Sequence, residues 1–202
     1  MSKRLRIALE GAINGKAARE LEYTFYGKLS NFDQLEQAVE VEEHEQWRLP
    51  LETEQPIKAR LRLINGRRYT LTTKVARPGQ LGVEEVNSDI TQDMFNHLKM
   101  AAVDGYKKSR YSFPIAGTSL KWEIDVFMDR SGNKHPWVKL DLEVASPDQR
   151  LPDLPIDFTE LIVENGPKQT LEEKRFVRKL WDTEWQRLDA AAGIEPDRSE
   201  DE

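Results

Sequence analysis

Charged side chains occupy every second position in several segments of this chain, and apolar side chains alternate with them. In residues 19–29, RELEYTFYGKL, Glu20 and Glu22 would share one face of a strand, and Leu21 and Phe25 would share the other. A period of two is typical of a β-strand with one buried face. For a single strand, the usual interpretation of the charged face is contact with water.

The repetition of this pattern argues for a closed sheet. The predicted strands carry either acids (Glu20, Glu22; Glu85, Asp89; Glu123, Asp125; Asp141, Glu143) or bases (Lys58, Arg60, Arg62; Lys74; Lys108, Arg110). A face in contact with water would mix Ser, Thr and Gln with charges of both signs. Closing the sheet would bring the charged faces together around a lumen and leave the apolar faces for helices to cover. We expect an antiparallel α+β barrel or a strongly curved sheet.

The expected elements follow from periodicity and turn signals. Asn65-Gly66 between two alternating arms predicts a β-hairpin. Ser30 or Asn31 and the spacing of later apolar residues predict a helix over 30–47. A second helix is predicted over 90–105, capped by Thr91, with Met94, Phe95, Leu98 and Ala102 inward and Gly105 at its end. Further strands are predicted near 82–90, 106–115, 119–129 and 136–146, and helices near 170–188.

Composition excludes several classes of function. The chain has 202 residues, a formal net charge of −6 and no cysteine. An acidic chain is a poor general binder of nucleic acid, and without cysteine there is no disulfide, thiolate metal site or Cys nucleophile. No apolar run has the length of a membrane helix. We expect a cytoplasmic protein with an arm or short helix at 1–18, one domain at 19–188 and an acidic tail at 189–202.

The lumen charges predict the chemistry of the ligand. Arginines and lysines in fixed arrays suit phosphate oxygens. Clustered carboxylates would repel one another and a polyphosphate, unless Mg²⁺ or Mn²⁺ bridges carboxylate and phosphate oxygens. The constellation therefore predicts a polyphosphate together with a divalent metal ion.

A resemblance to a known family supports this interpretation. Glu20-Leu-Glu22-Tyr-Thr24 resembles the ExExK signature of the CYTH superfamily, the triphosphate tunnel metalloenzymes. Further matches follow in order over roughly residues 19–185: Arg60-Leu-Arg62, Thr72-Thr73-Lys74, Glu85, Lys108-Ser-Arg110-Tyr111, Trp122-Glu-Ile-Asp125-Val-Phe127 and Leu140-Asp-Leu-Glu143-Val. The resemblance implies an eight-stranded antiparallel β-barrel, a triphosphate tunnel with helices packed outside.

The resemblance also implies roles for matching residues. Arg60, Arg62, Lys74 and Arg110 would bind phosphate, with Lys108 as a helper. Glu20, Glu22, Asp141 and Glu143 would bind Mg²⁺ or Mn²⁺, with Asp125 assisting and Glu85 as the family's first acid on its strand. The catalytic set would be Glu20, Glu22, Lys74 and Asp125.

Two positions depart from the family pattern. Thr24 stands where the signature has a lysine that positions the attacking water or a phosphate, so hydrolysis could be slow or altered. Lys28 is a candidate substitute for it. Asn87 stands where a second glutamate is common after Glu85. A cation from the C-terminal helix, within 174–179, could also reach the tunnel.

Other site classes have little support. His44, His97 and His135 lie in three different predicted elements, which argues against a histidine metal site. No GxxxxGK[ST] loop is present, which excludes a P-loop enzyme. We expect a metal-dependent triphosphatase that acts on tripolyphosphate, thiamine triphosphate or a nucleoside triphosphate. The alternatives are a class IV-type adenylyl cyclase and a protein that binds a nucleotide or polyphosphate without turnover, in each case as a monomer or homodimer.

Overall fold

The computed structural model describes residues 18–51, 57–77, 81–129 and 132–165, together with Gln186 and Ala190. Its elements are β1 (Ala18–Lys28), the 3₁₀-helix η1 (Asp33–Gln37), β2 (Glu40–Leu49), β3 (Ile57–Ile64), β4 (Arg68–Val75), β5 (Val83–Asp89), α2 (Gln92–Lys99), β6 (Asp104–Pro114), β7 (Lys121–Met128), β8 (Lys134–Val144) and β9 (Glu160–Asn165). None of the described helices is long and apolar enough to span a membrane.

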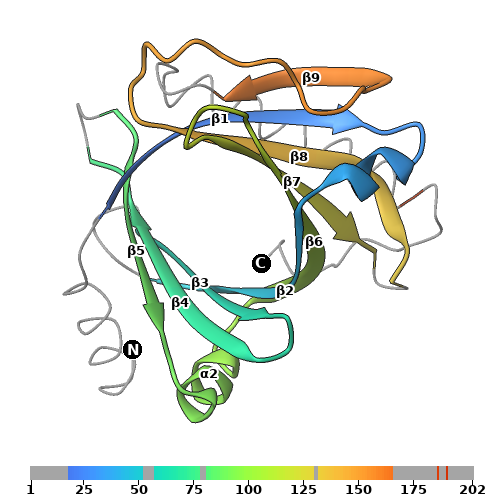
Figure 1. Ribbon diagram of the computed structural model, residues 1–202. Helices are drawn as coiled ribbons and strands as arrows, with labels where there is room; N and C mark the ends of the chain where they lie inside the picture. Colours follow the sequence, from blue (N-terminus) through green and yellow to red (C-terminus); the bar gives the residue numbers. More distant parts are fainter. Residues whose placement is uncertain are drawn as a thin grey trace.

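Eight of the strands close into an antiparallel barrel, and Figure 1 looks along it. The strand order is β5-β4-β3-β2-β6-β7-β8-β1, and pairing of β5 with β1 completes the circle. Only the start of β1 makes this closure, through the pairs Ala18↔Glu85, Arg19↔Glu84 and Glu20↔Val83. The predicted eight-stranded antiparallel barrel is confirmed.

Strand β9 extends the sheet beyond the closed barrel. It pairs with β1 over Thr24–Lys28, on the same edge that β5 uses earlier in the strand. The sequence predicts no strand between residues 146 and 170, so this strand was missed. Of the predicted helix at 170–188 only Gln186 lies among the described residues. The terminal arm and tail lie outside the described residues, except for Ala18 and Ala190, so these boundaries stay predictions.

The strand and hairpin predictions agree with the structure. The turn at 65–67 joins β3 to β4, and Asn65 and Gly66 have φ values of 51° and 67°. A positive φ suits Asn and Gly, which is why this dipeptide marks the hairpin. The side-chain carbonyl of Asn65 also accepts a hydrogen bond from the Glu43 N–H at 2.8 Å. The turn is thereby attached to the neighbouring strand.

The helix predicted over 30–47 is wrong beyond its first turns. Only Asp33–Gln37 is helical, and Ala38 is already extended. Val39, expected on the helical stripe, is 71% exposed. Residues 40–49 form β2 instead, because both of its edges are paired, with β3 and with β6. The two ladders overlap over residues 44–48 and take up backbone groups on both edges there, which local helical spacing could not indicate.

The apolar faces of the strands point outward and are covered. The larger core cluster lies outside β1, β6, β7 and β8, where Trp122 is 1% exposed and donates to the Asp153 carbonyl at 3.0 Å. Helix α2 covers β2, β3 and β4 through Phe95 and Leu98, each 2% exposed. This arrangement leaves the alternate, charged faces to line the interior.

Helix α2 confirms its predicted cap but not all of its predicted details. Thr91 Oγ1 accepts a hydrogen bond from the Met94 N–H at 3.2 Å. Met94 itself is 39% exposed, so its inward placement was wrong. Gly105 does not end the helix. It lies in β6 instead. Glycine stands there because a Cβ would come within 2.6 Å of the Trp47 ring.

Candidate active site

One polar cavity of about 770 Å³ fills the barrel interior. It is lined by all the residues to which the family resemblance gives a phosphate, metal or catalytic role: Glu20, Glu22, Arg60, Arg62, Lys74, Glu85, Lys108, Arg110, Asp125, Asp141 and Glu143. They come from seven different strands, and the period-two alternation places each of them on the inner face. The structure therefore brings the whole predicted set together, while their individual roles stay predictions.

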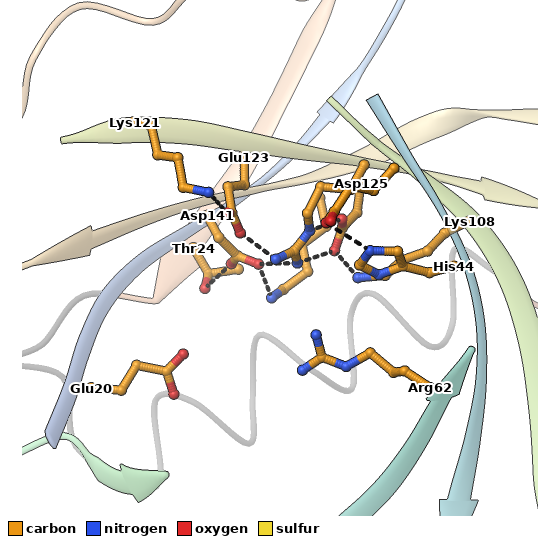
Figure 2. Close-up of polar contacts among 12 residues, drawn as sticks. Glu20, Thr24, His44, Arg62, Lys108, Lys121, Glu123, Asp125 and Asp141 are labelled. Carbon is orange, nitrogen blue, oxygen red and sulfur yellow. Dashed lines mark hydrogen bonds and ion pairs between the residues drawn. The ribbon is translucent and has the colours of Figure 1, made fainter. Parts of the chain in front are cut away.

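Four charges on β6 and β7 neutralise one another, and we call them the paired network: Lys108, Arg110, Glu123 and Asp125. Arg110 grips Asp125 with two parallel bonds, Nε–Oδ1 at 2.7 Å and Nη2–Oδ2 at 2.9 Å. Its third nitrogen bonds Glu123, and Lys108 bonds Asp125 Oδ2, which also accepts from Arg110 Nη2. Figure 2 labels Lys108, Glu123 and Asp125. Burial alone would raise the pKa of Asp125, but Lys108 and Arg110 hold it well below its usual range.

Asp141 on β8 joins the network to β1. Its Oδ1 accepts the Thr24 hydroxyl at 2.8 Å, and its Oδ2 lies 2.5 Å from Lys139 Nζ and 3.9 Å from Arg110 Nη2. Burial acts to raise the pKa of Asp141, but Lys139 lowers it overall. Thr24 is only 3% exposed, so its hydroxyl is committed to this carboxylate.

Lys74 connects the two strands that close the barrel. Its ammonium bonds Glu20 on β1 and lies 2.7 Å from Glu85 Oε2 on β5. Burial acts to raise the pKa of Glu85, but Lys74 and then Arg60 bring it down to about 2. Glu20 behaves in the opposite way, because burial raises its pKa to about 7 against the pull of Lys74. Glu20 is therefore the acid that titrates near neutral pH.

Asn87, which departs from the family pattern, completes a relay of hydrogen bonds. Arg62 donates to the Thr72 hydroxyl at 3.3 Å, and Thr72 donates to the Asn87 side-chain carbonyl at 2.5 Å. The Asn87 amide then donates to Glu85. A carboxylate at this position would have no proton to donate and would repel Glu85. Asn87 thus fits the partners that this chain places around it.

Arg60 and Arg62 on β3 point into the cavity with much less compensation. Arg60 Nη2 lies 3.7 Å from Glu85 Oε2, and Arg62 has no ion pair among the described residues. The Nε atoms of both arginines are buried without a hydrogen-bond partner. Burial, together with Arg60 and Arg110, lowers the pKa of Arg62 to about 10. These guanidinium groups have donors available for an anion.

Glu22 and Glu143 are the corresponding uncompensated acids. They are direct cross-strand partners in the pairing of β1 with β8. Within the described part of the chain, neither carboxylate has a side-chain hydrogen bond or an ion pair. Desolvation, then Glu123 and Glu85, raises the pKa of Glu143. We call Glu22, Arg60, Arg62 and Glu143 the open charges.

The open acids have the chemistry of a Mg²⁺ or Mn²⁺ site. No cluster of three or more His, Asp or Glu side chains converges on one point among the described residues. Mg²⁺ is commonly bound by one or two carboxylates and completes its shell with water and phosphate oxygens. Glu22 and Glu143, with Glu20 two positions from Glu22, could supply those carboxylates. The other predicted metal ligands, Glu85, Asp125 and Asp141, already pair with cations.

The structure adds functional candidates that the sequence analysis did not nominate. Lys139 lines the cavity, as its alternation with Asp141 could have indicated, and Glu123, predicted among the lumen acids without a role, lines it too. His44 lies on β2 behind the cavity, where its Nε2 is 3.0 Å from Glu42 Oε2 and its Nδ1 has no partner. Burial and the nearby Lys108 lower the pKa of His44 to about 4. It was missed because β2 was predicted to be helical.

Two sequence hypotheses fall outside this site. Lys28, the candidate substitute for the signature lysine, pairs with Glu160 on β9 at 2.9 Å and does not line the cavity. His97 and His135 lie on α2 and β8, so the three histidines occupy different elements as predicted. The cation considered within 174–179 lies outside the described residues.

Comparisons with known proteins give only distant similarities. No protein-family model matches the chain, and no curated protein matches it. Among solved structures, it is similar to the inorganic triphosphatase NE1496, with 23% identity, a TM-score of 0.44 and coverage of 71% of this chain and 86% of that one. Another structure of NE1496, described as a hypothetical protein, has 25% identity, a TM-score of 0.41 and coverage of 64% and 78%.

A third similar structure is a "putative adenylate cyclase (bh2851)" from Bacillus halodurans. It has 15% identity, a TM-score of 0.34 and coverage of 72% of this chain and 77% of that one. The closed barrel described above is the fold that the sequence resemblance to the CYTH superfamily implies.

Proposed function

We propose that the chain hydrolyses a triphosphate compound inside its barrel with the help of a divalent metal ion. One observation carries the proposal. In a single cavity of about 770 Å³, Arg62 has no ion pair among the described residues, and Arg60 has only a 3.7 Å contact with Glu85. In the same part of the chain, the acids Glu22 and Glu143 have no basic partner. Such separated charges cost folding free energy unless a ligand neutralises both. A metal–triphosphate complex carries the two complementary charges.

The basic open charges would bind the phosphate chain. Arg60 and Arg62 lie at alternate positions of β3, about 6.6 Å apart along the strand, with both side chains toward the lumen. Guanidinium groups bind phosphate oxygens bidentately, and desolvation in the cavity strengthens such bonds. Lys74 adds a cation on the neighbouring strand β4. Lys108 and Arg110 would act mainly by holding the acids of the paired network in place.

The acidic open charges would bind the metal ion through Glu22 and Glu143, with Glu20 beside them. When bound, Mg²⁺ or Mn²⁺ would offset phosphate charge and polarise a phosphoryl oxygen. Water would attack the terminal phosphorus, and the bond from that phosphorus to its bridging oxygen would break. Orthophosphate and the shortened phosphate compound would then leave. Catalysis would rest on positioning and charge stabilisation, with no covalent enzyme intermediate.

The test is a product assay with three substrates. The purified protein is incubated with Mg²⁺ or Mn²⁺ and tripolyphosphate, thiamine triphosphate or ATP, and the products are resolved by phosphorus NMR. We expect orthophosphate from at least one substrate, and none when EDTA replaces the metal. Arg62→Ala and Glu22→Gln should abolish the signal. Arg77→Ala is the matched control, because Arg77 pairs with Glu84 on the outer side of the barrel.

Each other outcome identifies a different function. Pyrophosphate together with cyclic AMP from ATP would make the chain a cyclase. Ligand-dependent thermal stabilisation without product would make it a binding protein. The proposal would be overturned by either result, and also by activity that survives Arg62→Ala and Glu22→Gln together.

A further inference from the structure

The strand that carries the signature acids lacks its cation. In Glu20-Leu-Glu22-Tyr-Thr24, the third inward-facing residue of β1 is a threonine. Its hydroxyl reaches only as far as Asp141 Oδ1, at 2.8 Å. A short neutral side chain cannot contact an anion in the middle of the cavity. If the cavity holds a triphosphate, another residue has to supply positive charge at this level of the barrel.

Lys139 is placed to do so from the adjacent strand. The pairing of β1 with β8 sets Thr24 opposite Asp141 and Tyr26 opposite Lys139. The Lys139 side chain folds back along β8, and its Nζ lies 2.5 Å from Asp141 Oδ2. One carboxylate therefore receives the Thr24 hydroxyl on one oxygen and the Lys139 ammonium on the other. A single carboxylate thus links the cation of β8 to the hydroxyl of β1 (Thr24 and Asp141 are labelled in Figure 2).

Lys139 retains its charge and has spare donors. Burial lowers the pKa of Lys139, but Asp141 and Glu22 raise it well above its usual value. An ammonium group carries three N–H donors, and Asp141 accepts one of them. The side chain lines the cavity and is 26% exposed, so the remaining donors can face a ligand. Asp141 orients the ammonium, in the way that a carboxylate orients any flexible lysine.

Lys28 is a poorer candidate for the same task. It lies four residues beyond Thr24 on β1, at the end of the strand. Its ammonium is 2.9 Å from Glu160 of β9, and the side chain does not line the cavity. Its position outside the cavity makes Lys28 a control for charge without contact to the ligand.

We infer that Lys139 supplies from β8 the phosphate-binding cation that position 24 lacks on β1, and that Thr24 and Asp141 hold its ammonium in place. The ligand class is the terminal phosphate of a linear triphosphate. This inference rests on the proposed function for its ligand, although binding alone is enough to test it. It predicts that the cation can be exchanged between the two strands.

The experiment compares four variants with the wild type: Lys139→Met, Thr24→Lys, the exchange Thr24→Lys/Lys139→Thr, and Lys28→Met. Each is measured for tripolyphosphate affinity by calorimetry in EDTA, for kcat and KM with Mg²⁺, and for its unfolding transition. We expect Lys139→Met to weaken affinity about tenfold and to lower kcat/KM about 100-fold. The exchange should recover at least tenfold of that loss, and Lys28→Met should change neither quantity more than twofold.

A structural role for Lys139 would give a different pattern. Lys139→Met would then lower the unfolding transition while leaving the affinity of the folded protein unchanged, and the exchange would restore stability alone. That result would overturn the inference, as would an exchange variant that folds but remains as weak as Lys139→Met. If Lys139→Met does not fold, the exchange variant is compared with Thr24→Lys and with the wild type. An exchange variant that folds but has an affinity and a kcat/KM far below those of the wild type would overturn the inference.

The outcomes separate this inference from the proposed function. Normal hydrolysis by Lys139→Met would overturn the role of Lys139 and leave the triphosphatase in place. Tripolyphosphate binding without turnover in the wild type, lost in Lys139→Met and regained in the exchange, would overturn hydrolysis and support Lys139. A wild type that neither binds nor hydrolyses tripolyphosphate, thiamine triphosphate or ATP would overturn both.

Discussion

The paired network on β6 and β7 and the open charges around it use similar residues in different ways. In the network, Asp125 is 1% exposed and has two cations in contact with it. Among the open charges, Arg62 has only a long hydrogen bond to Thr72 within the described part of the chain, and Glu22 faces another acid. A buried charge with an ion-pair partner is satisfied within the fold, whereas a buried charge without one gains a partner when a ligand binds.

The comparison predicts the largest effect for Asp125→Ala. Removing this carboxylate would leave Lys108 and Arg110 buried without their main partner, which typically costs about 3–5 kcal/mol. We expect a large drop in the free energy of unfolding, measured by urea denaturation without ligand. Asp89→Ala is the control, because its pair with Arg68 is exposed and should cost less than about 1 kcal/mol. If the two substitutions lower the free energy of unfolding equally, the paired network contributes no more to stability than an exposed ion pair does.

Arg62→Ala should lower activity without lowering the stability of the ligand-free protein. Loss of a charge-assisted bond to phosphate should lower kcat/KM about 100-fold. The ligand-free protein should be as stable as the wild type or more stable, because Arg62 is a desolvated cation close to Arg60 and Arg110. Steady-state kinetics and thermal unfolding of the same preparation would show this. A loss of stability as large as that of Asp125→Ala would place Arg62 in the structural group.

Metal binding should depend on the open acids alone. We expect Mg²⁺ or Mn²⁺ at 100 times its Kd to stabilise the wild type by about 2.7 kcal/mol through mass action. Glu22→Gln and Glu143→Gln should each remove most of this gain and should stabilise the metal-free protein slightly, because these acids face each other. Glu123→Gln is the control within the paired network. Thermal unfolding with metal or EDTA makes the measurement, and a metal effect lost only in Glu123→Gln would contradict the assignment.

Much of the site was predictable because the period-two pattern decides which face a side chain occupies. For Arg60, Arg62 and Asp141 the apolar residues on either side determine which face is the inner one, whatever the sheet's closure. The choice of partner was not predictable. Arg110 pairs with Asp125 and not with a ligand because β6 lies beside β7 in a particular register, and register depends on contacts far apart in the sequence.

The two missed strands show the limit of local patterns. In residues 40–49 the inward positions hold Glu42, His44 and Gln46, so no apolar alternation marks the strand. Both of its edges are paired, and this tertiary context overrides weak helical spacing. Strand β9 is only six residues long and depends on the edge of β1 that β5 leaves unpaired. Long-range pairing created both elements.

His44, hidden by the missed strand, makes stability depend on pH. Its pKa is lowered to about 4 in the fold, so its contribution is full above the unfolded value of 6.5 and is lost as the pH falls toward 4. At pH 5 this should cost the wild type about 1–2 kcal/mol relative to pH 7. His44→Asn should reduce that difference, measured by urea denaturation at both pH values. An unchanged difference would show that other groups determine the acid sensitivity.

The smallest effect is expected from Asn87→Asp, which brings a third acid beside Glu85 and Glu20. The substitution removes the amide that donates to Glu85, and the new carboxylate repels it. Lys74 and Arg62 lie close enough to offset part of that repulsion, so we expect a loss of only about 1 kcal/mol in the free energy of unfolding at pH 7. Mg²⁺ should restore it if the added acid turns toward the open acids. If Mg²⁺ does not restore the lost stability, the role of position 87 is limited to the hydrogen-bond relay between Thr72 and Glu85.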